Sequence, residues 1–380
     1  MKILLLAVPI GAGHIKAANA IKQAIEKLSP ESEVRFEDCF KWVLPVYGFM
    51  YKNIYEYCQK NATWILKIFY QGMGVKTGGD KTLYAFHKMT AYRFSDLIQG
   101  YKPDYVLCAH FSPAYYSALY KQKFKFRIGV VVTDYYIHPH WVNKEIDDYF
   151  IPNEDLSEQI LKYGAKAAQI HPFGIPVNIA LEGEIDRDTA RKRFGLSSER
   201  ISVVVMGSKV FGGEWFEIVQ EIVDFDCDLL VLCGENKEVM ERIKKLKGRA
   251  NLKVYGMVDK IQELIAVCDI LITKAGGITT TEATKAGPCL LFANSIPGLE
   301  DKNEEFFIKH NAGLKITKEN AKKVIYELLL HRERIAEMKK NLLKLGKRNS
   351  ALNIAQTILK SLKKGTGTFI INLCQGLRVA

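Results

Sequence analysis

The sequence predicts an α/β protein made of two consecutive, doubly wound domains. Its 380 residues are too many for one ordinary domain and enough for two of 150–200 residues. Short apolar runs of strand length alternate with helical patterns along most of the chain, which is typical of β-α-β units around a parallel sheet. A turn-rich stretch, Pro172–Pro176, separates two such series.

The first half contains four apolar or alternating runs of strand length. They are Ile3–Val8, Glu33–Glu37, Tyr105–Ala109 and Ile128–Thr133. Between the first two, apolar residues recur at helical spacing from Ala17 to Leu28. The run at Met1–Ile10 also resembles the start of a signal peptide, but Pro9 interrupts it, and we expect a buried first strand instead.

The second half contains five more runs that predict buried strands. They are Ile201–Met206, Leu229–Cys233, Lys253–Tyr255, Ile270–Thr273 and Leu290–Phe292. We place the boundary near residues 174–186, with Asp186–Arg193 in the helix that opens the second half. The predicted division is 1–177, 178–348 and 349–380, the last being a helix and a tail whose pattern we could not interpret.

The composition is that of a globular protein, with 48% hydrophobic and 25% charged residues. No apolar run approaches the roughly 18 residues that span a bilayer. The eight cysteines form no C-x-x-C pair, so we expect reduced packing residues in a cytosolic protein. The net charge of +12 predicts an anionic partner: nucleic acid, a phosphate-bearing substrate or an acidic lipid surface.

A glycine pair follows the predicted strand Ile270–Thr273 and opens a helix. Gly276 and Gly277 let the backbone approach a ligand, and the helix N-terminus offers free N–H groups to a phosphate. Thr279 adds a hydroxyl, and the Glu282 carboxylate can accept hydrogen bonds from both ribose hydroxyls. Alternatively, Thr279 and Glu282 form a capping box at an ordinary helix start.

His14 is the predicted catalytic base. It follows the first strand and stands at a helix start, where the helix dipole disfavours a protonated imidazole. A neutral imidazole can take the proton of an attacking hydroxyl, and Asp134 is the carboxylate that strand order places best to stabilise the resulting imidazolium. Alternatively, His14 only contacts a phosphate or packs in its loop.

These motifs together resemble a known family. The matching segments are Gly11–His14, Val132–Asp134, His138–Trp141, Gly174–Val177, Lys274–Glu282 and Ile296–Asn303. They are similar to the plant galactolipid synthases and the bacterial processive diacylglycerol glucosyltransferases, relatives of the enzyme that glycosylates lipid I. The resemblance implies the GT-B fold: two Rossmann-like domains facing across a cleft, with the donor in the second, the acceptor in the first and no essential metal. We expect no cofactor.

The resemblance also implies roles for residues outside the glycine pair. Gly207 and Ser208 would approach the diphosphate of UDP, Met257 and Val258 would flank the uracil, and Glu300 and Asn303 would face the sugar hydroxyls. Gly207–Ser208 can equally be an ordinary turn. Leu299 stands where the family usually has Gln, which leaves the donor sugar open, and Ala12 replaces a family glycine.

His138 and His140 have no third ligand nearby, so they make a poor metal site. We assign them, with Gly13, to the acceptor side of the cleft; for the two histidines an ordinary surface loop is the alternative.

The segment Pro45–Arg127 combines basic and aromatic residues. It carries 12 Lys/Arg against 4 Asp/Glu and 20 of the chain's 41 aromatic residues. Aromatic rings at headgroup depth beside cations suit an anionic membrane surface, so we predict that Lys52, Lys60, Trp64, Lys67 and Lys76 contact lipid. An ordinary core with a solvated lysine face is the alternative. Single-stranded nucleic acid would use the same residue types, but no recognition motif accompanies them, and we expect no nucleic-acid partner.

We therefore expect an inverting glycosyltransferase that moves a hexose from a UDP-sugar to diacylglycerol, with glucose as the expected hexose. The enzyme would add one sugar, or would add a further sugar to its own glycolipid product. It would be a peripheral, monotopic protein at the cytoplasmic face of the cell membrane. The alternatives are transfer of N-acetylglucosamine to a polyprenyl diphosphate, epimerisation of a UDP-sugar, and a nucleotide-binding regulator without turnover.

Overall fold

The computed structural model describes residues 1–10, 13–62, 64–65, 68, 81–179, 185–207, 214–298 and 300–376. Within its helices, the side chains of residues 52, 56, 59–61, 81–83 and 364–376 are outside the description. The predicted lipid contacts Lys52, Lys60, Lys67 and Lys76 and the predicted diphosphate contact Ser208 therefore lie, wholly or by their side chains, outside the described residues. So do Gly11, Ala12 and Leu299.

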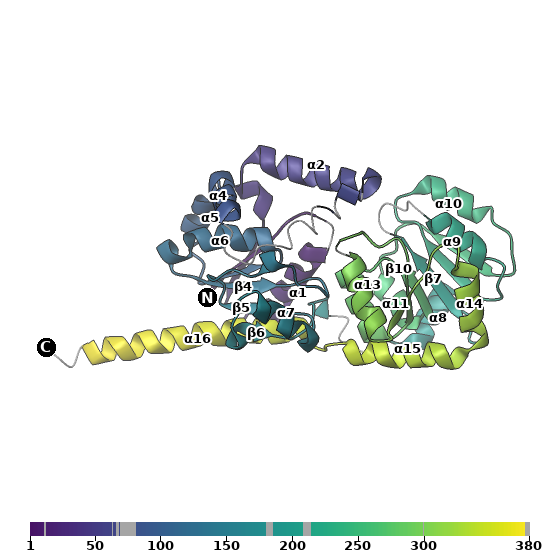
Figure 1. The fold of residues 1–380 in the computed structure, drawn as a ribbon. Coiled ribbons are helices and arrows are strands. Elements are labelled where there is room, and N and C mark those ends of the chain that lie inside the picture. Colours follow the sequence, from purple (N-terminus) through teal and green to yellow (C-terminus); the bar gives the residue numbers. More distant parts are fainter. Residues whose placement is uncertain are drawn as a thin grey trace.

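Two six-stranded sheets, both entirely parallel, form the centres of two lobes (Figure 1). The first sheet has the order β2-β1-β3-β4-β5-β6 and the second β12-β11-β10-β7-β8-β9. The strands of the first are β1 Lys2–Ala7, β2 Glu33–Asp38, β3 Tyr105–Cys108, β4 Arg127–Val131, β5 Asp148–Phe150 and β6 Ile170–His171. Those of the second are β7 Ser202–Met206, β8 Asp228–Leu232, β9 Asn251–Tyr255, β10 Ile270–Thr273, β11 Cys289–Phe292 and β12 Gly313–Lys315.

The predicted α/β class with two doubly wound sheets is confirmed, and all nine predicted strands are present. Three short strands were missed: β5, β6 and β12. Each has two or three residues, too few to produce a periodic pattern in the sequence. These segments are recognised as strands only by their hydrogen-bonded pairing with a neighbouring strand.

Helices connect the strands and cover both sheets. The first lobe contains α1 Gly13–Leu28, α2 Pro45–Asn61, α4 Lys81–Thr90, α5 Phe94–Tyr101, α6 Phe111–Phe124 and α7 Ser157–Lys162, with 3-10 turns η1 Cys39–Trp42, η3 Pro139–Trp141, η4 Glu154–Leu156 and η5 Ala167–Gln169. The second contains α8 Arg187–Phe194, α9 Trp215–Ile222, α10 Lys237–Lys244, α11 Ile261–Val267, α12 Gly277–Ala286, α13 Glu300–Lys309, α14 Ala321–Leu330 and α15 Arg332–Leu345. Asp186 caps α8, so the helix predicted to open the second half is present.

The last helix, α16 Ser350–Gly376, returns to the first lobe. Its buried residues Ala351, Ile354 and Ile358 pack in one apolar cluster with β1 and α1. Figure 1 shows α16 running along the side of the first lobe that lies opposite α2. The segment from 365 on, which the sequence pattern left without interpretation, continues this helix as far as Gly376.

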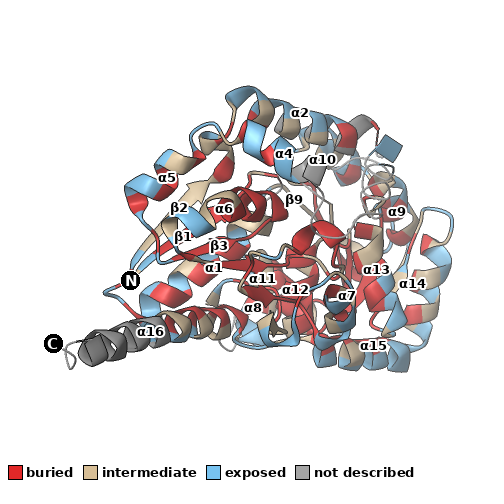
Figure 2. Ribbon diagram, turned by 60° about the vertical axis from the view of Figure 1, so that its left-hand side comes forward, coloured by how far each residue is buried: buried red, intermediate tan, exposed pale blue. Residues whose placement is uncertain are grey.

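The inner strands of both sheets are almost entirely buried, whereas the outer strands β2, β6 and β9 are half-buried. Figure 2 shows α1 and α6 beside the strands of the first lobe. The cysteines that the structure describes are seven free, buried thiols. Among the described residues, no helix is both long enough and apolar enough to cross a membrane.

Strand order determines where a ligand site can form. In the first sheet the order reverses between β1 and β3, and in the second between β7 and β10. Ligands in such sheets bind outside the carboxyl ends of the strands at these reversal points. A ligand site is therefore expected in the loops after β1, β3, β7 and β10.

Candidate active site between the two lobes

Two helix N-termini meet between the lobes: α1, which follows β1, and α12, which follows β10. Gly277 opens α12, and a Cβ added there would lie 1.9 Å from the carbonyl oxygen of Thr133 in the first lobe. A Cβ on Gly13 would lie 3.3 Å from the Ile278 side chain. Only glycine permits the first of these approaches, so Gly277 brings the two lobes into backbone contact.

His14 lies in the first turn of α1, close to this contact. Its Nδ1 is 3.0 Å from the Thr133 hydroxyl, and its ring meets the His110 ring edge-on with 4.9 Å between centroids. Burial lowers the pKa of His14 to about 4, partly offset by a hydrogen bond with the backbone of Ala109. The imidazole is therefore neutral at pH 7, and with the proton on Nδ1 its Nε2 has a free lone pair.

Asp134 faces the second lobe. Its carboxylate accepts a hydrogen bond from the Asn303 amide at 3.1 Å. Burial raises the pKa of Asp134 to about 6; Glu300 raises it further, and the Asn303 bond and Lys274 oppose the shift. We expected Asp134 to pair with His14, but in this structure the hydroxyl of the preceding residue, Thr133, occupies that position.

Asn303 is fully buried and joins the two lobes. Its Oδ1 accepts from the backbone N–H of Tyr135 at 2.7 Å, and its Nδ2 donates to Asp134 and to the Ala275 carbonyl at 2.9 Å. The amide predicted to face sugar hydroxyls is thus engaged entirely with protein groups here.

Glu300 lies beside the glycine pair. Lys274 Nζ is 2.6 Å from its Oε1, and the backbone N–H of Ile296 donates to its Oε2 at 2.9 Å. A Cβ on Gly276 would lie 3.7 Å from Oε1. The Lys274–Glu300 ion pair therefore places one cation and one carboxylate at the start of α12.

Glu282 lies one turn into α12 and is buried. Burial raises the pKa of this carboxyl, while Lys16 of the first lobe and a 3.2 Å hydrogen bond from Gln262 lower it. The N-cap of α12 is Gly276, without any side-chain cap, so the capping-box alternative for Thr279 and Glu282 is wrong. Thr279 is half-buried in the same first turn.

The other predicted nucleotide contacts follow strands of the same sheet. Gly207 directly follows β7, at the reversal point, and is half-buried. Met257 and Val258 follow β9; Met257 is 72% exposed, whereas Val258 packs against the core. The neighbouring loop lies close, since a Cβ on Gly256 would be 3.4 Å from the Gly234 carbonyl.

His138 and His140 are both buried, so the surface-loop alternative is wrong. His138 caps η3 by accepting from the backbone N–H of His140. The His140 ring contacts Phe111, and Phe111 contacts His110, which meets His14. A continuous row of rings thus leads from these histidines to the candidate base.

The sequence analysis gave no role to three residues of the site, although Thr133 lies in the matching segment Val132–Asp134: they are His110, Thr133 and Tyr135. His110 directly follows the predicted strand Tyr105–Ala109 and caps α6, so the rule that ligands bind at strand ends could have found it. Thr133 and Tyr135 flank Asp134, but their contacts depend on how the lobes meet.

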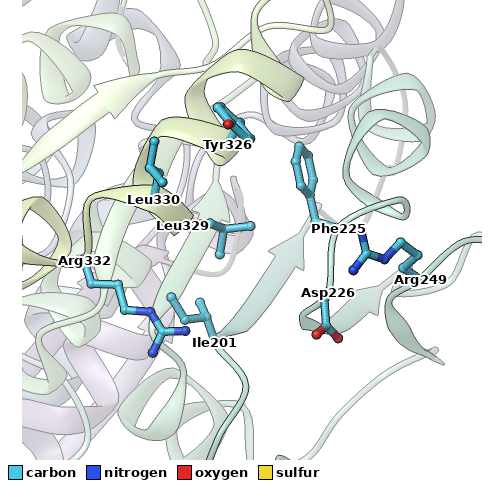
Figure 3. A pocket seen from close by; sticks show the side chains of 8 residues that line it. All are labelled: Ile201, Phe225, Asp226, Arg249, Tyr326, Leu329, Leu330 and Arg332. Atoms are coloured by element: carbon cyan, nitrogen blue, oxygen red, sulfur yellow. The ribbon is translucent and has the colours of Figure 1, made fainter.

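The pocket in Figure 3 is distant from this site in the topology. Ile201, Phe225 and Arg249 precede β7, β8 and β9, so the pocket lies at the amino edge of the second sheet, with Tyr326, Leu329 and Leu330 of α14 across it. Within the described part of the chain, no group of three or more His, Cys, Asp or Glu side chains is arranged to hold a metal ion.

We expect Asp134→Asn to stabilise the fold at neutral pH. A carboxyl whose pKa rises from 3.8 to about 6 on folding binds more protons in the native state between these values, so stability falls as the pH rises through them. The variant keeps the Asn303 contact without the buried charge, a gain of at most about 3 kcal/mol at pH 7.5. Urea unfolding at several pH values would measure it. The gain should shrink towards pH 4, and a gain that does not change with pH would contradict the assignment.

Family models match both halves of the chain. Residues 14–177 match the model of monogalactosyldiacylglycerol (MGDG) synthase, and residues 215–358 match that of the glycosyltransferase family 28 C-terminal domain. The chain is 26% identical over 370 residues to a processive diacylglycerol beta-glucosyltransferase of Bacillus licheniformis, covering 94% of each chain.

Solved structures show the same fold. MurG of Acinetobacter baumannii superposes with a TM-score of 0.63 at 13% identity, over 94% of this chain and 99% of that one. The UDP-GlcNAc 2-epimerase of Neisseria meningitidis, solved with UDP-GlcNAc, has a TM-score of 0.61 at 14% identity, over 95% and 100%. The chain is thus a glycosyltransferase of GT-B fold that combines an MGDG synthase domain with a glycosyltransferase family 28 C-terminal domain, and it is similar over nearly its whole length to the processive diacylglycerol glucosyltransferases.

Proposed function

We propose that this protein transfers glucose from UDP-glucose to the hydroxyl of diacylglycerol, as a peripheral enzyme at the cytoplasmic face of a membrane. The observation that carries the proposal is the meeting of α1 and α12: a neutral histidine lies in the first turn of one helix and contacts Thr133, whose carbonyl meets the glycine-opened N-terminus of the other. The names of the relatives supply the sugar and the acceptor.

The donor would bind on the second lobe. The free N–H groups at the start of α12 would hold the diphosphate, and Thr279 would add a hydroxyl donor. Glu282, one turn further on, would accept hydrogen bonds from the ribose hydroxyls. Glu300, oriented by Lys274 and the Ile296 N–H, would meet the sugar.

His14 would act as the base. Its Nε2 takes the proton of the acceptor hydroxyl while the oxygen attacks the anomeric carbon, the bond from that carbon to UDP breaks, and UDP leaves with the electron pair. Attack from the face opposite UDP inverts the anomeric configuration. A pKa of about 4 makes a weak base, but bound UDP places anionic charge nearby and so raises the pKa during turnover.

An exposed apolar stripe on α2 supports a lipid surface. Val46, Phe49, Ile54 and Tyr57 recur at helical spacing and are between 53% and 72% exposed, while Tyr47, Tyr51 and Tyr55 on the other face pack against the core. Figure 2 shows the exposed face of α2 on the outside of the first lobe. Such a stripe is costly in water and suits burial at headgroup depth.

Exposed apolar residues also occur beyond α2. Trp64, which we expected at the membrane, is 63% exposed, and Ile68, Met89 and Tyr92 are similarly open. Exposed Lys88 and Lys41 lie within the same part of the chain. An epimerase that acts on a soluble nucleotide sugar has no use for this surface, whereas an enzyme whose acceptor is dissolved in a bilayer does.

The reaction is tested by His14→Ala. With UDP-glucose and diacylglycerol in mixed vesicles, the wild type should form glucosyldiacylglycerol, and the variant should lose roughly 10²–10⁴ in kcat because the hydroxyl then has no base. UDP affinity should change little, since the donor contacts lie in the other lobe. The control is His331→Ala, an exposed histidine between α14 and α15. Wild-type turnover in His14→Ala would exclude this residue as the base.

Membrane docking is tested by Phe49→Ser/Ile54→Ser. Each side chain buried in lipid contributes about 1.5–3 kcal/mol, so the double variant should bind vesicles at least about a hundredfold more weakly. Stability should change little, because both residues are exposed in the folded protein.

The matched control is Tyr326→Ser/Leu330→Ser, which removes two equally exposed apolar residues from α14 of the second lobe. Co-sedimentation with vesicles containing diacylglycerol and anionic phospholipid compares the two variants. Docking through α2 would be contradicted if both double variants lost the same amount of vesicle binding, or if neither lost any.

A further inference from the structure

We propose that Tyr135 is an anchor that holds the lobes closed and thereby positions the candidate base against the donor helix. Tyr135 belongs to the first lobe, in the loop after β4, yet its side chain is buried among residues of the second lobe. The role rests on the proposed function for its effect on turnover, but the anchoring itself is independent of it.

The Tyr135 ring is enclosed by apolar groups of α13. Its centroid lies 4.9 Å from that of Phe306 and 4.7 Å from that of Phe307. Aromatic pairs at these separations add to the stabilisation that burial provides. Opening the lobes would withdraw the ring from this position and expose all three side chains to water.

Polar contacts determine the depth and direction of insertion. The Tyr135 hydroxyl lies 3.0 Å from the Thr281 hydroxyl on α12, and the Tyr135 backbone N–H donates to Asn303. Burial raises the pKa of Tyr135 to about 12, so the phenol keeps its proton. Both ends of the residue, side chain and backbone, are thus held by the second lobe.

The anchor is continuous with the site. Tyr135 follows Asp134, which is bonded to Asn303, and Thr133, whose hydroxyl orients His14 and whose carbonyl meets Gly277. Three consecutive residues therefore connect the base, the glycine pair and α13. Fixing the last of them fixes the separation of His14 from the N-terminus of α12.

The kinetic test compares two Tyr→Phe variants. Tyr135→Phe removes the hydroxyl bond between the lobes; Tyr149→Phe removes a buried hydroxyl bond to Asn143 within the first lobe. A buried hydrogen bond of ordinary strength corresponds to about a three- to tenfold effect, so Tyr135→Phe should lower kcat by that factor while UDP affinity measured by calorimetry stays within about twofold. Tyr149→Phe should leave both near wild type. The double variant Tyr135→Phe/Thr281→Val should lower kcat, relative to the wild type, by less than the product of the two single-variant factors, because both changes remove the same hydrogen bond.

Closure is measured directly with spin labels on Lys123→Cys and Glu241→Cys, exposed positions on α6 and α10, in a Cys374→Ser background. The described native cysteines are buried and should not react. The wild type should give one narrow distance distribution. Tyr135→Ala should shift it to longer distances, with Tyr149→Phe as the unshifted control.

An unchanged distance in Tyr135→Ala would overturn the anchor, as would equal kcat values for Tyr135→Phe and Tyr149→Phe. If Tyr135→Ala does not fold, Tyr135→Phe serves in the distance measurement, where a broadened distribution supports the anchor and an unchanged one rejects it. A shifted distance in a protein without glucosyl transfer would support the anchor and reject only the proposed function.

Discussion

The backbone contact between Gly277 and the carbonyl of Thr133 is the constraint on which the candidate site depends. Any side chain at 277 would push the lobes apart, because a Cβ would lie 1.9 Å from that oxygen. The contact brings the start of α12 next to the residue whose hydroxyl orients His14. The base and the anion-binding helix end belong to different sheets, and this approach makes them one site.

The same contact explains the unusual ionisation of the site. Closing the lobes buries Asp134 and Glu282, and burial raises the pKa of both carboxyls, while it lowers the pKa of His14. A lysine of the opposite lobe offsets part of each carboxyl's shift: Lys274 lowers the pKa of Asp134, and Lys16 lowers that of Glu282. Several ionisable groups whose pKa values are shifted by burial at one place are typical of sites that bind charge or transfer protons.

Much of the fold was predictable because it depends on local patterns. The buried strands from Ile3 to Phe292 are apolar runs bounded by turns, and parallel order then determines which loops converge. The short strands β5, β6 and β12 carry no such pattern. The return of α16 to the first lobe has no local pattern either, because α16 packs on residues of β1 and α1 that are more than 300 positions earlier in the chain.

The residues of the candidate site also differ in whether a local sequence pattern or a contact between the lobes determines their place. Residues at the start of the helix that follows a strand, such as His14 and Gly276, could be found in the sequence, and each lies at the carboxyl-end side of its sheet. The pairing of side chains across the lobes could not. Asp134 was expected beside His14 and instead contacts Asn303, and Tyr135 gave no signal because an isolated tyrosine after a strand is ordinary until α13 encloses it.

The central claim is that the N-terminus of α12 binds the nucleotide of the donor, and calorimetry with UDP tests it most directly. Glu282→Ala removes the proposed ribose contact; Glu304→Ala removes a buried carboxylate of α13 that pairs with Lys315, without touching the start of α12. We predict that the wild type and Glu304→Ala bind UDP alike, and that Glu282→Ala binds it about ten- to a hundredfold more weakly, the loss expected for charge-assisted hydrogen bonds. Equal affinity in all three proteins would contradict it.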